Sequence, residues 1–82
     1  MILEITEYDH DVEFAQFLLR KYVHIKPING TAFDMKVESH LTTYPDGFVE
    51  IHGMRVDMDD PDVTPFGAAA IQLVDIYQLE IY

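Results

Sequence analysis

Residues 33–44 alternate between two kinds of side chain more regularly than any other part of the chain. The mostly apolar phase consists of Phe33, Met35, Val37, Ser39, Leu41 and Thr43, and the polar phase of Asp34, Lys36, Glu38, His40, Thr42 and Tyr44. A period of two residues is typical of a half-buried β-strand, because successive side chains point to opposite faces of a sheet. Pro45-Asp46-Gly47 follows, in which proline fixes φ and glycine accepts the left-handed region. We therefore predict a β-hairpin, and the fold must contain a sheet.

The three-residue loop sets the register of this hairpin. On the open face it places Tyr44, Thr42 and His40 opposite Phe48, Glu50 and His52, respectively. On the core face it pairs Thr43 with Val49 and Leu41 with Ile51.

The apolar phase changes after Ile51, and Gly53 stands at the change. A bulge at Gly53 would restore the phase, because one extra residue shifts all later side chains of a strand to the other face. The inward pairs would then be Met54 with Ser39, Val56 with Val37 and Met58 with Met35. The outward pairs would be Arg55 with Glu38 and Asp57 with Lys36, and such opposite charges would stabilise the hairpin.

The remaining segments carry weaker signals. Residues 2–6 are rich in β-branched side chains and predict a strand. Apolar residues recur at helical spacing over 12–22, and Asp9 and Asp11 are suitable caps for the start of that helix. Residues 64–74 begin with Thr64-Pro65, which is typical of a helix start. Residues 76–82 favour a strand through their β-branched and aromatic content, with a helical continuation as the alternative.

This order of elements predicts an α+β fold. It matches the β-α-β-β-α-(β) pattern of ferredoxin-like domains, in which two helices cover one face of an antiparallel sheet. If residues 76–82 extend the second helix, the fold becomes a three-stranded α+β domain with a longer C-terminal helix. In both cases 82 residues are expected to form a single domain, 1–82.

Composition limits the class of protein. The chain is 49% hydrophobic, which is too apolar for a disordered chain despite its net charge of −10. It contains no Cys, which excludes a disulfide framework and thiolate metal sites. No apolar stretch approaches a membrane span, so we expect a cytoplasmic protein without membrane contact. Because the chain has 15 Asp and Glu but only 5 Lys and Arg, it repels phosphate groups, and we expect no direct binding to nucleic acid.

The sequence offers little support for catalysis or for a cofactor. No motif of a nucleophile elbow, a phosphate-binding loop or a zinc protease is present, so we expect a protein that is not an enzyme. His40 with His52 and the 57–62 segment are the two places that could attract a cation. For both, the simpler interpretation is a solvated surface, because two exposed histidines lack supporting ligands and runs of charge usually face water. Asp9-His10-Asp11 is better explained by helix capping than by acid–base chemistry.

Negative charge is concentrated in two zones that are free of Lys and Arg. The first zone contains Glu4, Glu7, Asp9, Asp11 and Glu13, and the second contains Asp57, Asp59, Asp60 and Asp62. The two zones would merge if the start of the first helix lay beside the end of the third strand. Aromatic residues accompany them, and Tyr44 and Phe48 flank the hairpin turn as a candidate contact pair.

An acidic surface with tyrosines among its carboxylates suits a basic protein partner. We therefore expect a small inhibitor that occupies the nucleic-acid-binding surface of such a partner, as a phage or mobile-element inhibitor of host defence would do. Chain length limits this mimicry, because one molecule can replace only a short stretch of phosphates. The alternative is a structural or assembly module that associates with itself, for example as a homodimer, through a sheet edge and the aromatic face.

Overall fold

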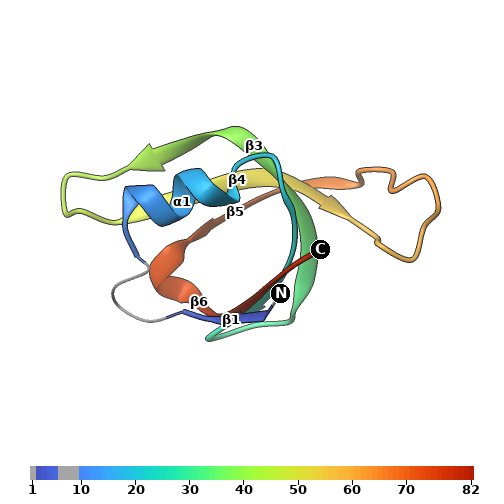
Figure 1. Ribbon diagram of the computed structural model, residues 1–82, viewed down its shortest axis with the longest axis horizontal. Coiled ribbons are helices and arrows are strands. Elements are labelled where there is room, and N and C mark those ends of the chain that lie inside the picture. Colours follow the sequence, from blue (N-terminus) through green and yellow to red (C-terminus); the bar gives the residue numbers. More distant parts are fainter. Residues whose placement is uncertain (1, 6–9) are drawn as a thin grey trace.

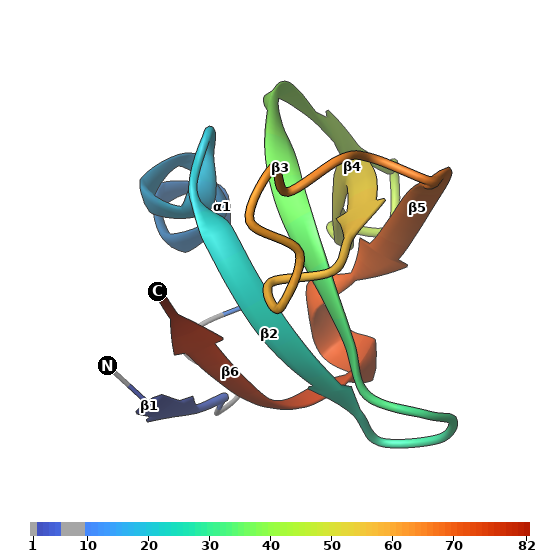
Figure 2. The same cartoon turned by 90° about the vertical axis from the view of Figure 1, so that its right-hand side faces the viewer.

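The computed structural model describes residues 2–5 and 10–82, in which six antiparallel strands form one curved sheet (Figures 1 and 2). The elements in chain order are β1 (Ile2–Glu4), α1 (Val12–Leu18), β2 (Tyr22–Pro27), β3 (Phe33–Thr43), β4 (Val49–Val56), β5 (Gly67–Gln72), the 3₁₀ turn η2 (Leu73–Asp75) and β6 (Ile76–Ile81). The strand order is β1-β6-β2-β3-β4-β5, and α1 packs against β3 and β4. None of the helices in the described ranges has the length and apolar character needed to cross a membrane.

The ferredoxin-like prediction is wrong, because the structure has only one α-helix in the described residues and no second helix over 64–74. Residues 67–72 form β5 along β4, and only the short η2 turn follows. The Ala-rich sequence of this segment prefers a helix in isolation, but pairing with β4 overrides a preference of a few tenths of a kcal/mol per residue. The three-stranded alternative is also wrong, because residues 76–81 form β6.

The predicted helix over 12–22 ends early, at Leu18. Arg20 has a φ of +67°, and its N–H donates to the carbonyl of Val37 at 2.9 Å. This left-handed residue turns the chain back onto β3, so Tyr22 begins β2 instead of continuing the helix. β2 pairs with β3 on one side and β6 on the other, and this strand was not predicted from the helical spacing over 12–22.

The hairpin register is confirmed close to the turn and wrong farther away. Thr43 pairs with Val49, Thr42 with Glu50 and Leu41 with Ile51, as predicted. The irregularity lies in β3 between Val37 and Leu41, and Gly53 pairs directly with Val37. Arg55 therefore faces Met35 rather than Glu38, and Met54 faces Lys36 rather than Ser39. The predicted pairs of Val56 with Val37, Met58 with Met35 and Asp57 with Lys36 are wrong for the same reason, since Val56 pairs with Asp34 at the end of β4.

Gly53 is required by close packing of the backbone instead of by a bulge. A Cβ atom at this position would collide with the carbonyl oxygen of Lys36 and with the Met35 side chain. The small residue lets β4 approach β3 where the β3 chain is irregular.

The core lies on the concave side of the sheet and under α1. Its members are Ala15, Leu18, Val23, Ile25, Met35, Val37, Val49, Ile51, Leu73, Ile76 and Leu79. The odd-numbered residues of β3 and β4 supply four of these, which confirms the inward phase that the sequence predicted for Met35, Val37, Val49 and Ile51. Val56 is buried to 3% exposure but does not belong to this cluster. It lines two hollows beside the loop that joins β4 to β5.

Candidate partner-binding surface

The loop over residues 57–66, which we call the acidic loop, joins β4 to β5 at one end of the long axis of the molecule (Figure 1). Asp57 Oδ1 accepts a hydrogen bond from the Asp59 N–H at 2.9 Å, and Asp60 Oδ1 accepts one from the Asp62 N–H at 3.0 Å. Asp60 Oδ2 accepts a further bond from the Thr64 N–H at 3.3 Å. Asp57 and Asp60 thus shape the loop, while Asp59 and Asp62 are exposed.

Backbone hydrogen bonds in the acidic loop also affect the pKa of Asp60. Hydrogen bonds from the N–H groups of Asp62 and Thr64 hold the pKa of Asp60 below its ordinary value, because they stabilise the carboxylate form. Val63 adopts a φ of +48°, a backbone conformation that β-branched residues rarely occupy. Hydrogen bonds within the loop therefore shape its backbone around Asp60 and favour the carboxylate form of that side chain.

Two hollows lie beside the acidic loop. One has a volume of about 340 Å³ and extends from Tyr22 and Lys36 to Val63 and Pro65. The other has a volume of about 580 Å³ and lies between Phe33, Arg55 and Phe66. Phe66 is 66% exposed, so an apolar ring stands next to the aspartates. The loop thus combines charge with apolar contact area.

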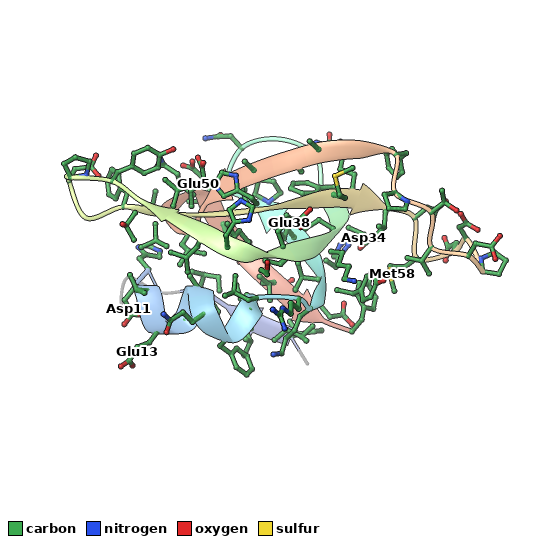
Figure 3. The ribbon with its side chains drawn as sticks, turned by 90° about the horizontal axis from the view of Figure 1, so that it is seen from above. Asp11, Glu13, Asp34, Glu38, Glu50 and Met58 are labelled. Carbon is green, nitrogen blue, oxygen red and sulfur yellow. The ribbon has the colours of Figure 1, made fainter. Side chains whose placement is uncertain are left out.

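Two residues of the first acidic zone, Asp11 and Glu13, lie at the other end of the molecule. Asp11 caps α1, since its Oδ1 accepts a bond from the Phe14 N–H at 2.9 Å, and Glu13 follows in the first turn. The molecule measures 38 × 22 × 21 Å, and Asp11 and Glu13 lie at one end of the long axis while Met58 marks the acidic loop at the other (Figure 3). Asp11 and Glu13 are therefore separate from the acidic loop, and the predicted merging is not seen for them.

The other residues of the first zone contribute less information. Glu4 lies in β1, where it pairs with Gln78. Glu7 and Asp9, together with the predicted capping role of Asp9, lie outside the described residues.

The aromatic pair belongs to the α1 end of the molecule. Tyr44 and Phe48 flank the β3–β4 turn, which Figure 1 shows at the end opposite the acidic loop, and they are 37% and 43% exposed. The Tyr44 hydroxyl donates to Glu50 Oε1 at 3.1 Å, and this bond, followed by burial, raises the pKa of Tyr44. The structure thus does not bring Tyr44 and Phe48 together with the aspartates of the acidic loop.

Basic side chains lie mainly on aromatic rings. Lys21 lies over Phe17 at 4.4 Å, Lys36 over Tyr22 at 5.5 Å and Arg55 over Phe33 at 4.7 Å. Across residues 2–5 and 10–82, the ion pairs within 4.0 Å involve only histidines, namely His24 with Asp34 and His52 with Glu50. The sequence could not show the contacts of Lys36 and Arg55, because they depend on which strands become neighbours. In the part of the chain that the structure describes, the carboxylates of the acidic loop therefore form no ion pair within 4.0 Å with Lys or Arg, although Arg55 lines the same hollow as Asp57 and Asp60.

Two of the histidines, His40 and His52, lie side by side on the sheet. The rings of His40 and His52 stack at 5.2 Å, so their predicted proximity is observed although the backbone of β3 is irregular there. His52 Nε2 lies 2.8 Å from Thr42 Oγ1 and 3.1 Å from Glu50 Oε1. Within the described part of the chain, no group of three or more histidine and acidic side chains could hold a metal ion.

Comparisons of this chain with protein-family models, with characterised proteins and with solved structures find no match.

Proposed function

We propose that this chain is a small acidic protein that binds a basic, nucleic-acid-binding surface of a partner and blocks it. The observation that carries the proposal is the lack of Lys or Arg partners for the acidic-loop carboxylates in the described residues. Unpaired carboxylates in a loop of fixed shape attract basic side chains without first breaking internal ion pairs. The interaction is electrostatic and non-enzymatic, and we place it in the cytoplasm.

The dimensions restrict the mimicry to a local contact. Duplex DNA carries about one charge per 1.7 Å, or about 22 charges along the 38 Å length of this molecule. The chain has only 15 acidic residues, and they do not share one surface, since Figure 3 shows Asp34, Glu38 and Glu50 between the two ends of the molecule. The acidic loop therefore replaces a few phosphates, and the exposed Phe66 adds apolar contact beside them. This form of inhibition suits a protein that a phage or mobile element uses against host defence.

A displacement assay tests this function. Proteins that bind a DNA column are passed over the immobilised chain, and the captured partner is identified. The partner is then bound to a labelled DNA duplex, and its release is measured as the chain is added. We expect displacement, and we expect the double variant Asp59→Asn with Asp62→Asn to need about tenfold more protein. The matched control, Glu13→Gln with Asp46→Asn, removes the same charge at the opposite end of the molecule and should behave like the unchanged chain. Capture without displacement, or equal effects of the two double variants, would count against the proposal.

Self-association as an assembly module is the second candidate, and one observation favours it. β5 is an edge strand, and two copies of the chain could pair through it. A net charge of −10 on each copy opposes that pairing. Size-exclusion chromatography over a range of concentration and salt separates the two candidates.

A further inference from the structure

β5 is a sheet edge without the features that usually protect edges. It pairs with β4 along one side, and no other strand in residues 2–5 or 10–82 pairs with its second side. Its sequence, Gly67 to Gln72, contains no charged residue and no proline. Edge strands commonly avoid unwanted pairing through lysines, prolines or bulges.

The hydrogen-bond phase shows which backbone groups of β5 face outward. The Tyr44 N–H donates to the Phe48 carbonyl, so these two residues form a hydrogen-bonded pair between β3 and β4. Hydrogen-bonded pairs recur every two residues in an antiparallel ladder, so Thr42 and Glu50 form the next one. The backbone groups of Glu50 therefore point to β3, and those of its neighbour Ile51 point to β5. In agreement, the carbonyl of Arg55, four residues after Ile51, accepts a bond from the Phe66 N–H.

The same alternation fixes the orientation of the residues in β5. Ala69 and Ile71, opposite Gly53 and Ile51, direct their N–H and C=O groups to β4. Ala68 and Ala70 direct theirs to the open edge, and both residues are exposed. Two donors and two acceptors at the spacing of a strand are thus presented to solvent.

The surrounding charge selects the occupant of this edge. After Arg55 the chain contains no Lys, Arg or His, and the acidic loop and Asp75 stand before and after β5. A second copy of β5 would bring these like charges together. An extended segment with Lys or Arg at its ends would instead meet residues of opposite charge before Gly67 and after Gln72 in the chain, whereas Arg55, opposite Gly67, is the basic residue paired with β5.

We propose that β5 accepts an extended segment of the partner as an added antiparallel or parallel strand, with an uncharged middle and Lys or Arg at both ends. Backbone hydrogen bonds at Ala68 and Ala70 would hold the segment, and the flanking carboxylates would orient it. The positive charge of this segment rests on the proposed function, whereas the strand pairing rests on the geometry of β5 alone.

A peptide pair tests the proposal with the unchanged protein. The probe is a short labelled peptide with paired lysines at each end and alternating Val and Thr between them, and its match carries N-methyl groups on alternate central amides. N-methylation keeps the charge but removes the donors that strand pairing needs, so the matched peptide should bind about tenfold more weakly or worse. Equal binding of the two peptides would overturn strand addition while leaving the electrostatic function intact. Binding of neither peptide would also overturn it, and the displacement assay judges the proposed function separately.

Proline variants test the same edge from the protein side. Ala70→Pro removes an N–H that faces solvent, and proline is tolerated at such edge positions. We expect this variant to stay folded and to bind the probe about tenfold more weakly, with Ala68→Pro as a second variant of the same kind and Ala70→Ser as a control that keeps the N–H. Unchanged affinity in both folded proline variants would overturn the proposal. A concentration-dependent dimer that Ala70→Pro abolishes would overturn it as well, because a second copy would then occupy the edge.

Discussion

The hydroxyl of Tyr82 donates to Asp34 Oδ1 at 2.7 Å, and the same oxygen lies 2.7 Å from His24 Nδ1. The last residue of the chain is thereby joined to β3, across the strand β2 that lies between β6 and β3. This cluster ties three neighbouring strands together on the face opposite the core.

Replacing Tyr82 with Phe should weaken the fold modestly. The change removes one hydrogen bond to a carboxylate on a side chain that is 55% exposed, so we expect a loss of about 0.5–1.5 kcal/mol in the free energy of unfolding. Chemical denaturation measures this loss. Tyr77→Phe, at a residue that is 58% exposed, is the matched control and should change stability less.

The same tyrosine predicts a loss of stability at alkaline pH. Burial, followed by the hydrogen bond to Asp34, raises the pKa of Tyr82 from 10.0 to about 12. Because the folded state favours the neutral phenol, this contribution is complete below about pH 10 and is lost as the pH rises through 12. Phenolate absorbance during titration, compared between the unchanged chain and Tyr82→Phe, should show that the variant lacks the tyrosine with a pKa of about 12.

Replacing Gly53 with a larger residue should cause a packing defect that side-chain movement alone cannot relieve. Gly53→Ala places a methyl group against the Lys36 carbonyl, so we expect a loss of about 1–3 kcal/mol, measured by denaturation. Gly67→Ala is the control, because nothing lies within 4 Å of a Cβ atom there. Equal stability of the two variants would show that β3 and β4 do not approach closely at Gly53.

Asp60 predicts a loss of stability in acid. Its lowered pKa means that its contribution is present above about pH 4 and is lost as the pH falls through the lower folded-state value. Asp60→Asn should therefore reduce the difference in stability between neutral and acidic solution, whereas Asp62→Asn should leave it nearly unchanged. An equal reduction in both variants would contradict the assigned hydrogen bonds.

The parts of the fold that could be predicted from sequence are those set by local pattern. The turn at Pro45-Asp46-Gly47 and the alternation on both sides of it fixed the pairing of Leu41 with Ile51. The register of Gly53 depended on an irregularity in β3, which leaves no mark in the apolar pattern. Residues 67–72 were misassigned because alanines favour a helix when considered alone, and only the presence of β4 makes them a strand.

For the acidic residues, too, the sequence revealed what is local but not what depends on the fold. Their positions along the chain revealed two zones without basic residues, but the distance between the zones depended on the sheet order, which was predicted incorrectly. Lys36 contacts Tyr22 and Arg55 contacts Phe33 between neighbouring strands or at strand ends. The local sequence pattern therefore does not predict these contacts. The edge at β5 could not be seen before the strand itself was known.

The salt dependence of partner binding tests the central claim most directly. If the unpaired carboxylates of the acidic loop bind a basic surface, affinity must fall steeply as salt rises, and Asp59→Asn with Asp62→Asn must flatten that dependence. Binding is measured by titration of the captured partner at several salt concentrations. An affinity that is insensitive to salt, or a slope that the double variant leaves unchanged, would contradict the account.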